Sequence, residues 1–588
     1  MCAGISSTPP AGSNPMSRLP SPLLIKNTSA LLSQEKGTIS TPWDHKTTVA
    51  LVYPNSYYIG MSNLGLQSIY HLLNNLPDTL CERAFLPEHG EQQELKRTQR
   101  SLFSLESYHA LRDFHLIAFS LSFENDYPAI LTILELAAIP FLSATRGDEY
   151  PLIIAGGVCT FFNPEPLAEF FDLFIIGEAE EVLPQLIETY QHDRNKNTSK
   201  ELLLHNLSQI EGVYVPRFYE VRYTASGTIA SFTPKHKAIP STIRRKRTRQ
   251  LDRFPTCSAI ITPQTEFSDL FLMEVSRGCS HRCNFCTIGS VYQPYRTRSL
   301  KSLKETAARA LQQKLKIGLI GATLADHPHF ASLCAFIIQE GGKFSATSMR
   351  IDLLDEHVIT LLKRSGHQTI TLAPETGSER LRKVIHKDLS DEQICTTVGL
   401  IAHHHFRYLK LYFLIGLPTE NADDIEQLIA LTRKIKHHLM KAQPRSRNPQ
   451  TITLSINPFI PKPATPFQWH PLEHITSLKT KLKKIQNSFK KDKRIQVTWD
   501  LPKWSYLQCL LSRGDRRVGK ILLAAHQQGG NFLKAYKEVD SNPDFYTYRP
   551  RGLDEIFPWD FIDHGVSKQV LAAEYTRALM LDETTQEH

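Results

Sequence analysis

The fold is decided by FLMEVSRGCSHRCNFCTIG, residues 271–289. An apolar run typical of a buried parallel strand leads directly into three closely spaced cysteines, Cys279, Cys283 and Cys286. Thiolates are soft ligands suited to iron–sulfur clusters, and three of them leave one iron of a cubane without a protein ligand. The pattern therefore predicts a 4Fe-4S cluster whose open iron binds a further molecule.

Structural zinc is the alternative for this motif. Such a site needs four ligands, usually spaced as two CxxC pairs or a CxxC with paired histidines, and His281 inside the loop is the candidate for the fourth. The chain has ten cysteines, and outside this trio they are thinly scattered. Because the N-terminus has neither a basic start nor an apolar core of a signal peptide, we expect a reducing, cytoplasmic setting and a metal site rather than disulfides.

A series of strands and helices follows the cysteines. Each apolar run precedes a helical stretch, and this repetition predicts a full or partial (β/α) TIM barrel over residues 267–470, with its chemistry at the C-terminal ends of the strands. The runs are KIGLIGA (316–322), GKFSATSMR (342–350), QTITLAPE (368–375) and YLKLYFLIGLP (408–418).

A second strand and helix series precedes the cysteines. Its apolar strands alternate with helical stretches, which predicts a doubly wound, Rossmann-like domain over residues 47–192, so the chain is of the α/β class. The strands are TVALVYP (48–54), FHLIAFSL (114–121), PLIIAGG (151–157) and DLFIIGEAEE (172–181).

The remaining segments carry weaker patterns. Residues 1–46 are predicted to be a disordered extension, 193–266 a β-rich connector, and 471–588 a helical C-terminal region. Within the connector, IRRKRTRQ (243–250) is interpreted as a solvated arginine-rich loop, with contact to RNA as the alternative.

Bulk properties exclude few functions. The formal net charge is +9 over 588 residues, which permits an anionic partner without requiring one. Apolar stretches of about 18 residues are missing from the sequence, so no membrane span is expected.

The cysteine motif, including Phe285 before its last cysteine, resembles that of the radical S-adenosylmethionine superfamily, and the likeness extends over residues 271–469. The resemblance implies that S-adenosylmethionine binds the open iron and is cleaved by one electron from a flavodoxin- or ferredoxin-like donor. The resulting radical abstracts hydrogen from a substrate, or the cofactor supplies a methyl group.

The resemblance also implies contacts to S-adenosylmethionine. Glu375 and Lys387, twelve positions apart in TLAPETGSERLRKVIHKDLS, would meet the ribose or ammonium and the carboxylate, respectively. Ser348 and Arg350 match polar residues at the end of the preceding strand, and Ile415 matches an apolar contact to adenine. We assign no catalytic residue beyond these cofactor contacts.

One part of the barrel departs from the superfamily. Many members carry a GGE-type motif after the second strand, whereas here Gly321 and Ala322 have no adjacent glutamate. Asp326 and His327 follow; a surface loop is the favoured interpretation for them, and a position facing the active site is the alternative.

An α/β domain before such a barrel resembles the cobalamin-binding radical S-adenosylmethionine family. The likeness is carried by three pieces, which begin at Tyr53, Ala155 and Ile175, and it places Gly156 and Gly157 against a nucleotide tail. The DxHxxG motif that supplies a histidine ligand to cobalt is missing. Two alternatives stay open: cobalamin bound without a protein histidine, or a domain that has lost this cofactor.

Two other functions compete. A tRNA or ribosomal-protein methylthiotransferase would need three N-terminal cysteines for a second cluster, but only Cys81 and Cys159 lie in the N-terminal α/β domain. A non-catalytic scaffold that binds RNA or protein through a structural metal loop is the third hypothesis. The substrate is not identified by any motif.

Overall fold

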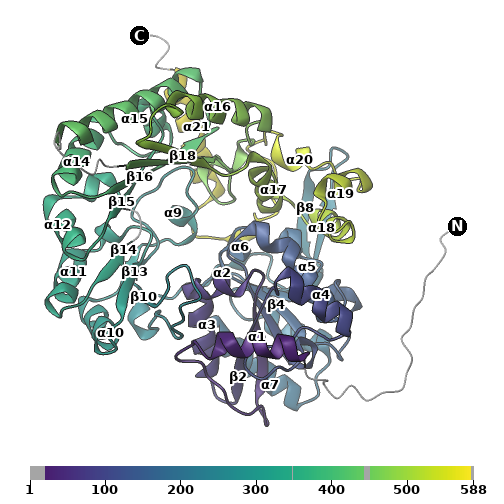
Figure 1. The fold of residues 1–588 in the computed structure, drawn as a ribbon. Helices are drawn as coiled ribbons and strands as arrows, with labels where there is room; N and C mark the ends of the chain where they lie inside the picture. Colours follow the sequence, from purple (N-terminus) through teal and green to yellow (C-terminus); the bar gives the residue numbers. More distant parts are fainter. Residues whose placement is uncertain (1–19, 347–348, 443–450, 584–588) are drawn as a thin grey trace.

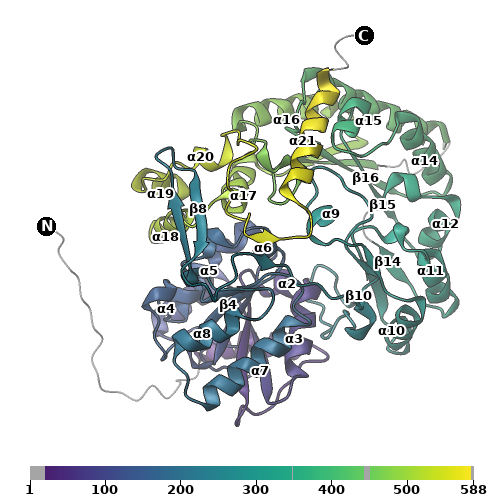
Figure 2. The ribbon, with the colours of Figure 1, turned by 180° about the vertical axis from the view of Figure 1, so that it is seen from behind.

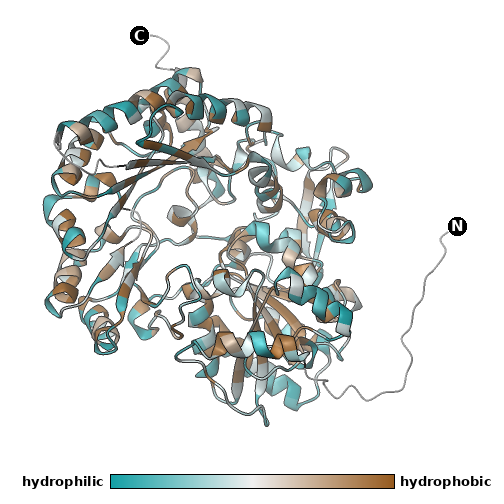
Figure 3. Cartoon of the chain, viewed as in Figure 1, coloured by the Kyte–Doolittle hydropathy of each residue, from teal (hydrophilic) through white to brown (hydrophobic). Residues whose placement is uncertain are grey.

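The computed structural model describes residues 20–346, 349–442 and 451–583. Two units built on mainly parallel sheets lie side by side, and the C-terminal part of the chain contacts both (Figures 1 and 2). Apolar residues concentrate on the strands, while polar residues lie mostly on the outward faces of the helices (Figure 3). This distribution is that of two separately packed cores.

The N-terminal unit contains a six-stranded sheet in the order β2-β1-β3-β4-β5-β6. All neighbours pair in parallel except β5 and β6, and the chain reverses its progress across the sheet between β1 and β3, as in a doubly wound fold. Every residue of β1 is buried, because helices cover both faces. The strands are β1 (Thr47–Tyr53), β2 (Thr79–Phe85), β3 (Leu116–Ser120), β4 (Leu152–Gly156), β5 (Leu173–Ile175) and β6 (Val213–Tyr214).

The prediction that residues 1–46 are disordered is wrong for residues 20–46. Helix α1 (Pro22–Leu32) buries Leu24 against the N-terminal unit. Glu35 then forms an ion pair at 2.7 Å with Arg83, and both side chains are almost fully buried. A buried arginine needs a carboxylate partner, so this segment is required to complete the core.

The second unit is a partial barrel, as the sequence predicts. Strands β10, β13 and β14 form one parallel sheet and β15 to β18 another, and among the described residues a bridge between Met349 and Leu372 joins them. Helices such as α10 (Leu300–Gln312), α12 (Glu356–Arg364) and α14 (Asp391–His403) form an outer ring (Figure 1). The strands are β10 (Leu270–Glu274), β13 (Lys316–Ile320), β14 (Phe344–Ala346), β15 (Thr369–Glu375), β16 (Tyr408–Ile415), β17 (Thr451–Pro458) and β18 (Ile495–Trp499).

The barrel sheet continues beyond residue 470, where the helical C-terminal region is predicted to start. Strand β18 pairs in parallel with β17 after helix α16 (Ile475–Phe489). Residues from 500 onward are mainly helical, as expected, and they contact both units. Arg516 forms an ion pair at 2.8 Å with Glu165 of the N-terminal unit, and α21 (Lys568–Glu583) packs on α13 (Glu379–Val384) of the barrel.

The connector contains the predicted β structure as a hairpin of β7 (Tyr219–Tyr223) and β8 (Ile229–Pro234). Further along, β9 (Ile243–Arg244) pairs in parallel with β19 (Ile562–Asp563) near the C-terminus. Within the described ranges, no helix combines the length and apolar character needed to cross a membrane.

Candidate functional site

The three cysteines lie on a loop closed at its base by two short antiparallel strands. Strand β11 (Ser276–Arg277) pairs with β12 (Arg296–Thr297), and residues 278–295 between them are called the cysteine loop below. The loop starts at Gly278, whose φ is 88° and where an added Cβ would lie 2.4 Å from the carbonyl oxygen of Tyr292. Only glycine fits this start of the loop.

The environment of the thiols fits a 4Fe-4S cluster. The backbone N–H of His281 donates to Cys279 Sγ at 3.4 Å, and backbone N–H groups of residues 288 and 289 donate to Cys286. Burial raises the pKa of the Cys283 thiol to about 12, and the charge of Lys387 opposes this rise. A cubane uses one thiolate per iron, so its ligands need not converge on one ion. Within the described residues, no three His, Cys, Asp or Glu side chains are grouped to hold a single metal ion.

Asp326 faces the cysteine loop, so its expected position on a surface loop is wrong. Its carboxylate lies 3.0 Å from His281 Nε2, accepts a hydrogen bond from the Ser280 hydroxyl, and is 7% exposed. His327 is also buried, and its Nε2 lies 2.9 Å from the carbonyl oxygen of Arg298. His281, the candidate fourth zinc ligand, is thus paired with a carboxylate.

Glu375 and Lys387 contact each other. Lys387 Nζ donates to Glu375 Oε1 at 3.0 Å and to the carbonyl oxygen of Ala373 at 2.6 Å, and Lys387 is buried. Glu375 has a φ of 68° after a register shift at the end of β15, a left-handed conformation that few non-glycine residues adopt. The two residues predicted to contact S-adenosylmethionine therefore form an ion pair with each other in this structure.

The other predicted contacts lie around the same strand ends. Arg350 forms a bidentate ion pair with Asp352, and its positive charge lowers the pKa values of the Cys279 and Cys283 thiols, against the rise that burial causes. Ile415 is fully buried at the end of β16. Phe285 packs on a small apolar cluster that includes Leu381 and Phe467. Ser348 lies outside the described residues.

A cavity of about 510 Å³ lies between the two units. The C-terminal ends of β3, β4 and β5 line one side and those of β10 and β13 the other, and helices α3 (Leu64–Asn74) and α7 (Val182–Asn195) contribute apolar walls. Gly156 and Gly157 both line it, and their contact with a nucleotide tail stays a prediction. A Cβ added at Gly156 would meet no atom closer than 3.8 Å, whereas one at Gly157 would clash with the Leu121 carbonyl oxygen at 2.4 Å.

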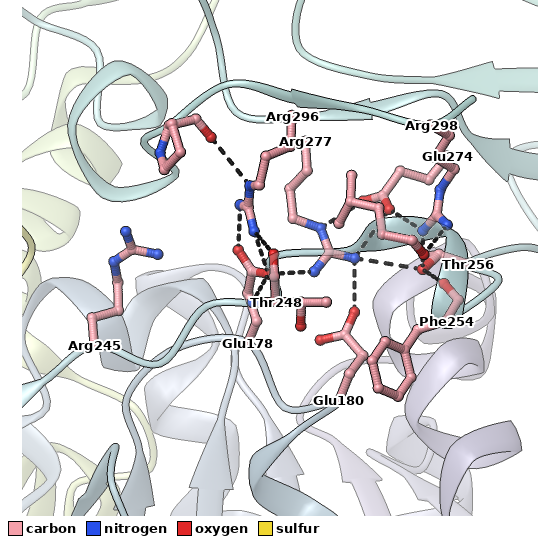
Figure 4. A network of polar contacts seen from close by, with 12 residues as sticks. Glu178, Glu180, Arg245, Thr248, Phe254, Thr256, Glu274, Arg277, Arg296 and Arg298 are labelled. Atoms are coloured by element: carbon pink, nitrogen blue, oxygen red, sulfur yellow. Dashed lines mark hydrogen bonds and ion pairs between the residues drawn. The ribbon is translucent and has the colours of Figure 1, made fainter. Parts of the chain in front are cut away.

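Charged side chains join the units beside this cavity (Figure 4). Glu178 of the N-terminal unit accepts hydrogen bonds from Arg277 at 2.8 Å and from Arg296 at 2.6 and 2.9 Å. Arg277 also pairs with Glu180 at 2.7 Å and with Glu274 at 2.9 Å. The sequence does not predict this network. The one local sign of it is the acidic run GEAEE, residues 177–181, in the N-terminal unit.

The basic run 243–250 is part of the same interface, so its interpretation as a solvated loop is wrong for its buried members. Arg245 and Thr248 are 3% and 1% exposed. Arg245 and Arg247 both donate to the carbonyl oxygen of Gln293 in the cysteine loop, at 2.9 and 3.2 Å. The Gln293 side chain in turn donates to the Cys279 carbonyl oxygen at 2.8 Å.

Comparisons with known proteins define the class. The model for the N-terminal part of radical SAM proteins matches residues 65–216, and that for the radical SAM superfamily matches residues 273–432. An uncharacterized protein of Methanocaldococcus jannaschii is 30% identical over 481 residues, 81% of this chain and 90% of that protein. The chain belongs to the radical S-adenosylmethionine superfamily, and it is an enzyme that depends on S-adenosylmethionine.

More distant similarities cover parts of the chain. An uncharacterized methyltransferase of Pyrococcus horikoshii is 21% identical over 300 residues, 49% of this chain and 59% of that protein. Among solved structures, the radical S-adenosylmethionine methyltransferase TsrM of Kitasatospora setae, with cobalamin and a [4Fe-4S] cluster bound, matches with a TM-score of 0.44 and 14% identity, over 70% of this chain and 72% of that one. The assignment to the superfamily does not depend on these weaker likenesses.

Proposed function

We propose that this enzyme cleaves S-adenosylmethionine at a 4Fe-4S cluster held by Cys279, Cys283 and Cys286, and that the cavity between its two units binds cobalamin for methyl transfer. The observation that carries the proposal is the cavity itself, which is lined by the C-terminal strand ends of both units. Ligands of doubly wound domains and of barrels bind at these ends. The distant similarity to a methyltransferase supports the same reaction class.

Two features of the cavity support binding of the nucleotide tail of a corrinoid. Gly156 leaves open space above β4, and Leu51, Leu72 and Ile154 give it apolar walls. Apolar walls with few polar groups are typical of sites that enclose a large cofactor. When bound, cobalamin supplies a cobalt that accepts and donates a methyl group. No residue of the chain is assigned as a ligand to that cobalt.

The strand ends of the barrel would hold S-adenosylmethionine. Lys387 and Glu375 carry opposite charges, as do the carboxylate and ammonium of the amino-acid part of the cofactor. Exchange of the internal ion pair for two ion pairs with the ligand would keep both charges compensated. The cysteine loop would leave one iron open beside them, and an external one-electron donor would reduce the cluster.

The methylthiotransferase alternative is less well supported. Its second cluster would need three cysteines in the N-terminal unit, and the two present are both buried in the core, Cys81 on β2 and Cys159 on α6 (Val158–Phe162). Iron well above four atoms per chain after reconstitution would favour this alternative over methyl transfer.

Anaerobic reconstitution with iron, sulfide and hydroxocobalamin tests the proposal. We expect about four iron atoms and one corrinoid to remain on each chain after gel filtration, with an altered corrinoid absorption spectrum. S-adenosylhomocysteine should form on reduction in the presence of S-adenosylmethionine. A chain that retains its cluster but no corrinoid would contradict the role of the cavity.

A further inference from the structure

The base of the cysteine loop carries an unfavourable pair of like charges. Arg277 on β11 and Arg296 on β12 lie directly opposite each other in the antiparallel register. Two cations at such positions repel each other and destabilise the pairing of the strands. The pairing is only two residues long, so its backbone hydrogen bonds alone give a weak closure.

Glu178 of the N-terminal unit compensates both cations at once. Its two carboxylate oxygens accept hydrogen bonds from Arg277 and Arg296, and its side chain is 2% exposed. The backbone N–H of Thr248 donates to the same carboxylate at 2.9 Å. Burial by itself would raise the pKa of Glu178, but the hydrogen bond from Arg296 and the charges of both arginines hold it below its usual value. The carboxylate is therefore ionised at neutral pH.

The two arginines differ in how much they depend on this carboxylate. Arg277 has two further carboxylate partners, Glu180 and Glu274. Among the described residues, Arg296 pairs with Glu178 as its one carboxylate, and its other bonds go to backbone carbonyl groups. Loss of the Glu178 charge would thus release the β12 side of the loop more than the β11 side.

The turn that carries Glu178 has little freedom to move. Gly177 has a φ of 121°, and an added Cβ there would lie 2.1 Å from the carbonyl oxygen of Lys246, so the backbone segments touch. The next residue, Glu178, and the arginine at position 277 both line the cavity between the units. The N-terminal unit therefore presents a fixed anion to the base of the cysteine loop.

We propose that Glu178 is a positioning residue through which the N-terminal unit holds the cysteine loop in the shape that keeps the cluster. Among the described residues, the hydrogen bonds and ion pairs of Glu178 go to Thr248, Arg277 and Arg296, and none goes to a cysteine of the loop. Its action is through Arg277, two residues before Cys279, and Arg296, at the far end of the loop. This inference rests on the assignment of the cluster and does not depend on corrinoid binding.

The test compares E178Q and R296Q, the double variant, and the control E211Q. Glu211 pairs with Lys246 at 2.7 Å in the same region but is partly exposed, so its charge can be removed without opening the loop. Hydrogen exchange of residues 278–295 is measured on the apo chain. Release of iron to a chelator and the midpoint potential of the cluster are measured on the reconstituted enzyme. Circular dichroism establishes that each variant is folded.

We expect E178Q to exchange the loop amides faster and to lose iron roughly tenfold faster than the unaltered enzyme, because the loop that orients the three ligands is held less firmly. Because a negative charge near the cluster is removed, its midpoint potential should rise. R296Q should show smaller increases in loop exchange and iron release, but its midpoint potential should fall, because this variant removes a positive charge. In loop exchange and iron release the double variant should be less impaired than the sum of the two. E211Q should match the unaltered enzyme.

Equal exchange, iron release and potential in E178Q and E211Q would overturn the proposal. If E178Q does not fold, R296Q decides the question, since Arg277 and Thr248 still hold Glu178 in that variant. A folded R296Q variant with unchanged loop exchange and iron release would also contradict the proposal. Corrinoid binding is scored separately, so its failure would leave this result unaffected.

Discussion

The C-terminal strand ends of the two units face each other across one cavity, but the residues at these two edges differ in chemistry. The N-terminal sheet ends in small residues, such as Ser120, Gly156 and Gly177. The barrel side presents Glu274 and Arg277, with the cysteine loop immediately behind. The N-terminal edge therefore offers a ligand space, backbone groups and the carboxylates of Glu178 and Glu180, whereas the barrel edge presents Glu274 and Arg277 beside the cysteine loop.

The buried carboxylates of the two units also differ in how their charge is compensated. On the barrel side, burial opposes ionisation of Glu274, but Arg277 and Arg298 hold its pKa below the usual value. On the N-terminal side, Asp126 follows β3 and is buried without an ion pair among the described residues, and burial raises its pKa to about 6. Glu274 is thus compensated within the barrel and Glu178 across the interface by Arg277 and Arg296, whereas Asp126 has no ion-pair partner among the described residues. Four substitutions test this contrast.

The largest effect is expected on the barrel side from Cys283→Ala. Removal of one of three cluster ligands should abolish the absorbance near 400 nm and the EPR signal of the reduced cluster. Cys257→Ala is the matched control, since this half-buried cysteine lies outside the loop. Corrinoid binding by the cluster-free variant should persist, because the cavity walls of the N-terminal unit are unchanged. A normal cluster in Cys283→Ala would refute the assignment of the ligands.

On the N-terminal side, Gly156→Val should extend a side chain into the space above β4, where an added Cβ would lie 3.8 Å from its nearest neighbour, Ile175 Cβ. We expect corrinoid affinity to fall roughly 10- to 100-fold, since a ligand cannot occupy the volume of the new side chain. Iron content should not change. Gly90→Val, at an exposed helical position with open space around it, is the control for a titration followed by absorbance. Unaltered corrinoid affinity in Gly156→Val would place the ligand elsewhere.

A somewhat smaller effect is expected from Lys387→Met. Loss of a charge-assisted hydrogen bond to the carboxylate of S-adenosylmethionine should weaken its binding by about tenfold. The measurement is the shift of the cluster EPR signal as S-adenosylmethionine is titrated. Lys383→Met, on the exposed face of the same segment, should leave the titration unaltered. If both variants bind equally well, Lys387 serves only to neutralise Glu375.

The smallest effect is expected from Asp126→Asn, and it depends on pH. In the folded chain the pKa of Asp126 is raised to about 6, above its ordinary value near 3.8, so the folded state binds this proton more tightly than the unfolded state does. Its contribution to stability is therefore lost as pH rises from about 4 to about 6. At pH 7 the variant should be more stable by about 1 to 3 kcal/mol, the upper value being the full shift of about two pKa units, and the gain should vanish below pH 4. Urea unfolding at both pH values measures this, and a constant difference would disprove the linkage.

The barrel site was more predictable than the cavity because thiols identify their chemistry and apolar residues do not. The CxxxCxxC spacing locates the cysteine loop from the sequence. By contrast, residues such as Leu51 and Ile154, which line the cavity, have the same apolar pattern as strands that pack fully in a core. The glycine pair at 156–157 was the one local hint, since small residues at a strand end permit a close approach.

Contacts between distant segments were not predictable from local patterns. Glu178 and Arg296 are 118 positions apart, and no periodicity connects them. The pairing of Glu35 with Arg83 likewise gives structure to a segment whose composition suggests disorder. Strand β18 was missed because the Lys-rich helix before it dominates the pattern of the region.

The most direct test of the central claim is EPR spectroscopy of the anaerobically reconstituted and reduced enzyme, with and without S-adenosylmethionine. We expect a 4Fe-4S signal that shifts when S-adenosylmethionine is added, because the ligand binds the iron that the three cysteines leave open. A chain that retains zinc instead of iron, or a cluster signal that S-adenosylmethionine does not alter, would contradict it.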